Sequence, residues 1–167
     1  MESSKFNIKW STSVKVITII GNVISFFPLL GMLFLPTDLF FIFIVFLSFI
    51  PLFFVFIYAF FKSPITLELS ETQIIVHKRK GVKIIDYNQI LKTEIYKPDK
   101  SDIRTFGVGG IFGFFGDFKN SKIGNYQAYV GDFKQAFLIQ TKEGKNYVVS
   151  CENRDLAMEI ITKNIKK

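Results

Sequence analysis

The sequence contains few of the side chains on which metal and redox chemistry usually depend. Its 167 residues include one cysteine, Cys151, and one histidine, His77. A lone cysteine excludes an intrachain disulfide, and these two residues cannot complete a Cys/His zinc site. The acidic residues are scattered singly, and no partner base is visible for Ser150 or Cys151. We therefore predict no catalytic residue, metal site or cofactor, and expect a protein that is not an enzyme.

Charge is missing from two long stretches near the amino terminus. Residues 16–35 and 39–61 contain no Asp, Glu, Lys or Arg, and phenylalanine is concentrated there. A helix of about 20 residues is long enough to cross a hydrocarbon core of about 30 Å. The two stretches predict a transmembrane α-hairpin over residues 1–62, with spans at about 14–35 and 39–61. Pro36, Thr37 and Asp38 would form the turn between them.

A cleaved signal peptide and a pair of buried helices are the alternatives to a hairpin in the membrane. The first stretch is longer than a signal-peptide core of roughly 7–15 residues, and no small-x-small cleavage site follows it. Two helices that are apolar on every face would also be too much surface for the rest of a chain of this size to cover. Both alternatives are therefore disfavoured.

Flanking charge predicts how the hairpin is oriented. Lys5, Lys9 and Lys15 precede the first stretch and Lys62 follows the second, whereas the turn carries only Asp38. Lys and Arg are retained on the cytoplasmic side of a membrane. We expect a multi-pass protein of the cell inner membrane with both termini in the cytoplasm and the lipid bilayer as a partner.

From Ile65 onward, apolar and polar residues alternate in short runs separated by turn residues, as is typical of antiparallel β-strands. The expected strands cover residues 65–70, 73–78, 82–87, 92–97, 126–130, 137–141 and 146–150. After Asn153, a helix cap, apolar residues recur at helical spacing up to Ile165. Residues 63–167 are thus predicted to form a cytosolic, mainly-β (α+β) domain. It would be a PH-like barrel of about seven antiparallel strands closed by a C-terminal helix.

Several segments of this domain are similar to a known family. The residues concerned are 104–116, Asn120, 123–126, 137–141, 144–145 and 147–150. They resemble the bacterial pleckstrin-homology-like domains, many of which follow one or two membrane spans. The resemblance covers about residues 63–165 and implies the PH-like fold and a membrane setting. It supplies no ligand or reaction, and so implies no catalytic residue.

A glycine- and phenylalanine-rich segment, residues 106–118, is the first candidate site. It is not a dinucleotide-binding fingerprint, because Phe112 occupies the position of the third glycine and no helix pattern follows. We expect an apolar loop or irregular hairpin that packs into the core, enters a bilayer interface or contacts a partner. The candidate binding residues are Arg104, Phe106, Gly107, Gly109, Gly110, Phe112, Gly113, Phe114, Phe115 and Gly116.

The second candidate site is the densest basic cluster, formed by Lys78, Arg79 and Lys80 together with Lys83. It would either attract anionic lipid headgroups or form an ordinary solvated turn. No nucleic-acid-binding motif accompanies it, and we expect no nucleic-acid partner.

We expect a non-catalytic binding or assembly module at the cytosolic face. The alternative is a sensor of an anionic lipid surface that uses the basic turn and the Gly/Phe-rich segment. A second copy of the chain or a membrane protein is the other expected partner.

Overall fold

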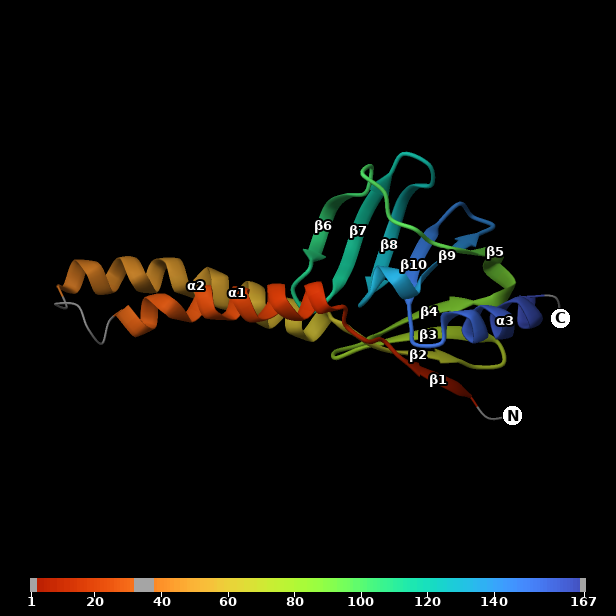
Figure 1. The fold of residues 1–167 in the computed structure, drawn as a ribbon, viewed down its shortest axis with the longest axis horizontal. Coiled ribbons are helices and arrows are strands. Elements are labelled where there is room, and N and C mark those ends of the chain that lie inside the picture. Colours follow the sequence, from red (N-terminus) through yellow and green to blue (C-terminus); the bar gives the residue numbers. More distant parts are fainter. Residues whose placement is uncertain (1–2, 32–37, 166–167) are drawn as a thin grey trace.

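The computed structural model describes residues 3–31 and 38–165. Two long helices, α1 (Thr12–Gly31) and α2 (Leu39–Lys62), extend together from one end of a β domain (Figure 1). The predicted helical hairpin is therefore present. Residues 32–35 of the first expected span, and Pro36 and Thr37 of the expected turn, lie outside the described residues.

The structure does not support the predicted transmembrane spans. Across residues 3–31 and 38–165, no helix combines the length and the apolar content that crossing a bilayer requires. A spanning helix needs about 20 consecutive, mainly apolar residues. The 20 residues of α1 include Lys15, Thr18, Asn22 and Ser25. The prediction of a multi-pass inner-membrane protein with both termini in the cytoplasm is therefore wrong.

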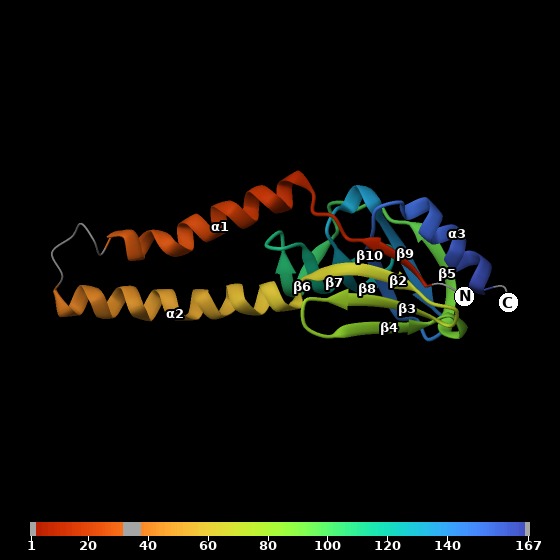
Figure 2. The same ribbon diagram turned by 90° about the horizontal axis from the view of Figure 1, so that it is seen from below.

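The β domain contains two sheets, and α3 (Arg154–Ile165) covers one end of it (Figures 1 and 2). The first sheet has the order β1 (Ser4–Asn7), β2 (Pro64–Leu69), β3 (Gln73–Lys78) and β4 (Val82–Asp86). The second has the order β5 (Ile90–Ile95), β9 (Ala136–Thr141), β10 (Asn146–Ser150), β8 (Gly124–Val130), β7 (Phe114–Asn120) and β6 (Ile103–Gly109). Short 3-10 turns, η1 (Tyr87–Gln89) and η2 (Phe133–Gln135), precede β5 and β9.

The mainly-β class and the C-terminal helix are confirmed, but the closed barrel is not. Within the described part of the chain, no strand pairing joins the four-stranded sheet to the six-stranded sheet. Barrel closure requires pairing between the two outermost strands, and β4 and β6 each end their own sheet. The expectation of purely antiparallel pairing is also wrong, because β8 and β10 run parallel.

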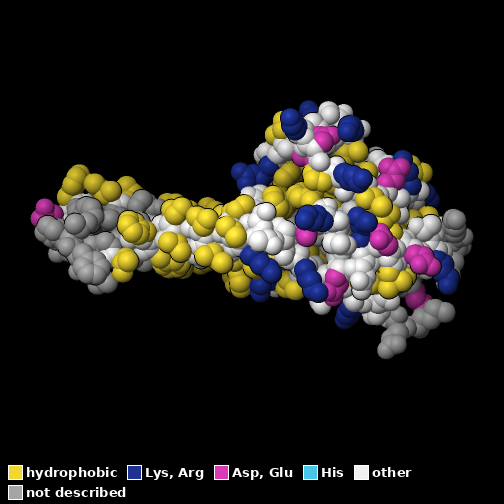
Figure 3. Space-filling model, viewed as in Figure 1, with side chains coloured by type: hydrophobic (Ala, Val, Ile, Leu, Met, Phe, Trp, Pro, Cys, Tyr) yellow, Lys and Arg dark blue, Asp and Glu magenta, His cyan; other side chains and the backbone are white. Residues whose placement is uncertain are grey.

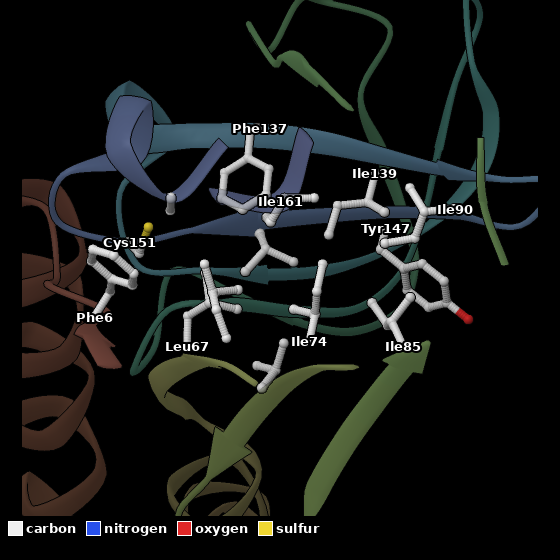
Figure 4. Packing of buried hydrophobic residues seen from close by; sticks show 14 of the residues in the cluster. Phe6, Leu67, Ile74, Ile85, Ile90, Phe137, Ile139, Tyr147, Cys151 and Ile161 are labelled. Carbon is white, nitrogen blue, oxygen red and sulfur yellow. The ribbon is translucent and has the colours of Figure 1, made fainter. Parts of the chain in front are cut away.

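The main core lies where the faces of the two sheets meet beneath α3 (Figure 4). Leu67 and Ile74 from the first sheet pack in one cluster with Phe137 and Ile139 from the second, and α3 contributes Ile161. All five side chains are fully buried. Burying a side chain of this size typically contributes about 1.5–3 kcal/mol. Packing between the two sheets and α3 therefore holds the domain together without barrel closure.

Candidate functional site

The basic turn between β3 and β4 lies against the end of α2. The backbone nitrogen of Arg79 donates to the oxygen of Ser63 at 3.1 Å, and that of Lys80 donates to the oxygen of Phe61 at 2.8 Å. Arg79 Nε also donates to Ser63 Oγ at 3.2 Å. The Arg79 guanidinium lies 4.2 Å from the centre of the Phe60 ring, within cation–π range. These contacts fix the turn where the hairpin joins the β domain.

Basic side chains from three separate segments gather at this junction, and we call them the basic collar. Lys9 and Lys15 line the same groove as Arg79, beside the start of α1. Lys62 ends α2 and lines a small hollow together with Lys78 from β3. With Lys80, which the turn places beside Phe61, the collar has six members. Figure 3 shows dark blue side chains beginning where the largely yellow hairpin meets the β domain.

Five of the six collar cations have no acidic partner in the described part of the chain. Lys9 is paired, because its Nζ lies 2.6 Å from Oε2 of Glu152. Over residues 3–31 and 38–165, no ion pair joins Lys15, Lys62, Lys78, Arg79 or Lys80 to a carboxylate. Burial lowers the pKa of Lys78, and the neighbouring charges of Lys62 and Lys83 lower it further. An excess of positive charge therefore surrounds the base of the hairpin, and it favours an anion.

The hairpin beyond the collar is apolar and open to its surroundings. Large hydrophobic side chains on both helices are exposed, among them Ile19, Phe27, Phe40 and Phe54. Figure 3 shows yellow side chains along the visible face of both helices. Apolar patches of this extent mark binding surfaces on proteins.

The Gly/Phe-rich segment forms β6, β7 and the turn between them, and this turn reaches the hairpin. The irregular hairpin expected from the sequence is therefore present, and its turn lies between the domain ends of α1 and α2 (Figure 2). The Phe112 ring packs against Trp10, Phe56 and Phe60, with ring centres 5.6–6.1 Å apart. The Phe112 nitrogen donates to Thr18 Oγ1 at 2.9 Å. Phe112 thus joins the β domain to both helices, because its backbone bonds to α1 and its ring packs on α2.

Two glycines allow β6 and β7 to approach closely. Gly107 and Gly116 are opposite each other in the pairing, and both have a φ in the left-handed region. A Cβ on Gly107 would overlap the backbone oxygen of Phe115, and one on Gly116 would overlap that of Phe106. A side chain at either position would therefore push the strands apart.

The remaining candidate residues do not form a single site. Phe115 is buried against Val108 and Ala59, whereas Phe106 is 69% exposed. The others are distributed as follows: Phe114 packs on Phe133, Arg104 lies beside Gly109, Gly110 and Gly113 lie in the β6–β7 turn, and Lys83 lies over the Tyr147 ring. Lys78, Arg79, Lys80 and the β6–β7 turn come together at the base of the hairpin. The hollow that Lys62 and Lys78 share there is also lined by four other candidates, Phe106, Gly107, Phe115 and Gly116.

Besides the small hollow at Lys62 and Lys78, two larger hollows adjoin this junction. The apolar cleft, about 340 Å³, lies between α1 and α2 and is lined by Asn22, Ser25, Phe26, Phe49, Phe53, Phe56, Ile57, Phe60, Phe61 and Phe112. The basic groove, about 400 Å³, is lined by Ile8, Lys9, Trp10, Lys15, Pro64, Ile65 and Arg79. Small-molecule sites in proteins typically measure about 300–1,000 Å³, and both hollows are of that size.

A third, polar cleft of about 600 Å³ lies away from the collar, between β4 and the second sheet. Two of its titratable groups already have partners. Lys145 pairs with Glu143 at 3.0 Å, and Asp117 accepts a hydrogen bond from Gln127. The Thr105 hydroxyl donates a hydrogen bond to the backbone oxygen of Asp117. No nucleophile–base pair is arranged in it, and the described residues hold no cluster of metal-binding side chains.

A comparison with protein families identifies the β domain. The model of the family described as Bacterial PH domain matches residues 65–164. The chain belongs to the bacterial PH domain family. No curated protein and no solved structure shows significant similarity to it. In this PH domain the basic turn and the β6–β7 turn both face the helical hairpin, and membership of the family supports a binding or assembly role.

Part of the junction was missed as a site by sequence reasoning. Lys9, Lys15 and Lys62 entered only as markers of orientation, and Trp10 was not singled out. Their common signal is that they flank the two uncharged stretches. The link to Arg79 could not be predicted, because it depends on how the turn after β3 folds back onto Ser63.

Proposed function

We propose that this PH domain is a non-catalytic binding module whose ligand is an anionic lipid surface. The observation that carries the proposal is the basic collar, five of whose six cations have no carboxylate partner among the described residues, at the base of a hairpin with exposed apolar side chains. Anionic lipids attract basic residues by about 1 kcal/mol per residue near the surface, and exposed apolar groups gain from burial at the interface. The proposal concerns contact with a lipid surface and requires no helix that crosses it.

Vesicle binding by the full-length chain tests the proposal. We expect binding to vesicles of phosphatidylcholine with phosphatidylglycerol to exceed binding to phosphatidylcholine alone and to weaken as salt is added. The double variant Lys15→Ala/Lys80→Ala should lose much of this preference. The matched control is Lys142→Ala/Lys163→Ala, which removes two charges from the β9–β10 turn and the end of α3, away from the hairpin (Figure 1). Equal binding to both vesicle types, or equal losses in both variants, would contradict the proposal.

Self-assembly is a second candidate, and the free edge of β4 supports it. Lys78 and Gly81 form a hydrogen-bonded pair at the β3–β4 turn. Antiparallel pairing alternates, so Val82 and Ile84 direct their backbone groups away from β3, toward the open edge. The side chains of both residues are about half exposed. A free strand edge is a template for pairing with a second copy of the same chain.

A proline substitution in β4 tests self-assembly through the free edge of this strand. Ile84→Pro removes the outward N–H without disturbing β3, whereas Ile84→Ala keeps that N–H and removes only side-chain contacts. Light scattering should show a dimer for the wild type and the alanine variant, and a monomer for the proline variant. A monomeric wild type would exclude assembly through β4.

A further inference from the structure

We propose that the junction is a discrete site for one anionic phospholipid, whose acyl chain occupies the apolar cleft and whose phosphate lies in the basic groove. The inference deepens the proposed function, on which it rests for the ligand class. It differs in predicting a one-to-one complex with a single lipid molecule.

The apolar cleft has the character of an acyl-chain site. Eight of its ten lining residues are Phe or Ile. Its two polar side chains are already engaged within α1: Asn22 Nδ2 donates to the Thr18 oxygen at 2.7 Å, and Ser25 Oγ donates to the Gly21 oxygen at 2.6 Å. A ligand that enters the cleft therefore meets mainly aromatic and aliphatic surface, which favours a hydrocarbon chain over a polar group.

The basic groove has the character of a phosphate site. Lys15 and Arg79 line it, and neither has a carboxylate partner among the described residues. Arg79 is held at the groove by its bond to Ser63 and by the Phe60 ring. An arginine fixed in this way can present parallel N–H groups to phosphate oxygens.

Two aromatic contacts connect the hollows. Arg79, on the groove side, lies over Phe60, which lines the cleft. Trp10, on the groove side, lies 5.8 Å from Phe112, which also lines the cleft. Phe60 and Phe112 are themselves 5.6 Å apart, so they form a common wall. The two hollows are therefore neighbours, so the charged head of one molecule can lie in the groove while its apolar chain lies in the cleft, whereas free phosphate would use only the groove.

Fluorescence of the single tryptophan, Trp10, can report lipid binding, because Trp10 lines the basic groove. The probe is lysophosphatidylglycerol with a doxyl quencher on its chain near the glycerol, added to the full-length protein below its critical micelle concentration. We expect saturable one-to-one quenching, and weaker binding of the equivalent lysophosphatidylcholine. In unlabelled competitors, affinity should rise about three- to fourfold per added methylene until the cleft is filled. Glycerol phosphate should compete poorly.

Two variants test the two hollows separately. Arg79→Gln should weaken lipid binding at least tenfold, whereas Lys163→Gln, on the far side of the domain, should not change it. Ile57→Phe narrows the cleft and should abolish the gain with chain length while leaving competition by glycerol phosphate unchanged. Circular dichroism and thermal melting check that each variant is folded, and the chain-length series on wild-type protein tests the cleft independently of any variant.

The outcomes separate this inference from the proposed function. Non-saturating quenching, equal affinity for both head groups, or glycerol phosphate competing as well as the lipid would overturn the discrete site. Anionic vesicle binding could still be observed in each of those cases. Saturable lipid binding without any preference for anionic vesicles would instead support the site and contradict the surface-binding function.

Discussion

The backbone nitrogen of Phe112 donates a 2.9 Å hydrogen bond to Oγ1 of Thr18, 94 positions earlier in the chain. Thr18 lies within α1 and is 7% exposed, and Phe112 lies in the β6–β7 turn. This bond and the aromatic contacts of Phe112 tie the hairpin to the second sheet. The position of the helices therefore depends on a turn far from them in sequence.

Thr18→Val removes the acceptor with almost no change of shape. The Phe112 N–H would lose its partner in a poorly hydrated place, and we expect the free energy of unfolding to fall by about 1–3 kcal/mol. Denaturant titration measures this change. Thr162→Val is the matched control, because that hydroxyl donates to the Met158 oxygen in the preceding turn of α3, on an exposed surface. Equal effects of the two variants would show that the Thr18 bond contributes nothing.

Phe112 and Phe106 belong to the same glycine-rich segment but have different surroundings. Phe112 packs on three aromatic rings, so Phe112→Ala should lower the free energy of unfolding by about 2–3 kcal/mol, somewhat below the cost at a fully buried Phe. Phe106 is largely exposed, and Phe106→Ala should change stability by no more than about 0.5 kcal/mol. Thermal unfolding of both variants checks the contrast, and the reverse order would contradict the placement of the turn.

Asp102 is the centre of a polar network that anchors the connection between β5 and β6. Its carboxylate accepts hydrogen bonds from the hydroxyls of Tyr96 and Tyr126 and from the amide of Asn120. Asp102→Ala would remove the acceptor that these three donors share, and we expect a loss of about 2–5 kcal/mol. Asp102→Asn keeps one oxygen acceptor and should cost less. Similar losses in both variants would show that the hydrogen bonds to the carboxylate oxygens are not what stabilises the connection.

The same connection gives the protein a defined response to acid. Hydrogen bonds from Ser101 and Lys122 lower the pKa of Asp99 from 3.8 to about 2. Because the folded state binds this proton less readily, the charged form stabilises the fold above about pH 4, and that contribution is lost as the pH falls toward 2. Asp99→Asn has no proton to gain there. The stability difference between wild type and Asp99→Asn should therefore shrink between pH 4 and pH 2, and a constant difference in acid unfolding curves would contradict this.

Cys151 should be chemically silent in the folded protein. Its side chain is buried in the main core, and burial raises the pKa of the thiol to about 12. Only the thiolate reacts readily with disulfide reagents, so labelling at pH 8 should proceed no faster than unfolding. Ser121→Cys places a second thiol at an exposed position and should be labelled at once. Rapid reaction of both thiols would contradict the placement of Cys151.

Local patterns predicted the strands that alternate strictly and the helix that follows Asn153. The turn at Gly81 and the apolar spacing of Ala157 and Ile161 are signals contained within a few residues. Strand β1 was missed, because Lys5, Phe6 and Asn7 are too few to show a period and become a strand only by pairing with β2. Barrel closure was wrongly predicted for a similar reason, because no local sequence pattern indicates whether two edge strands pair.

The candidate site was only partly predictable. The basic turn at Arg79 and the apolar turn at Phe112 stand out by composition, but nothing local indicates that both contact Phe60. That meeting follows from the packing of α2 against the end of the β domain. Lys83 belongs to the same basic cluster in the sequence but lies over the Tyr147 ring, because it is part of β4, opposite Val76, and not of the turn that folds back onto α2.

The register of β1 with β2 has a mechanical consequence. Ser4 pairs with Leu69 and Asn7 with Thr66, so the chain leaves the first sheet just before α1 and re-enters it, as its immediate neighbour, just after α2. The helical pair is thus an insertion between two adjacent strands, β1 and β2. A change in the tilt of the helices would therefore move both strands, and through Leu67 of β2 it would reach the main core.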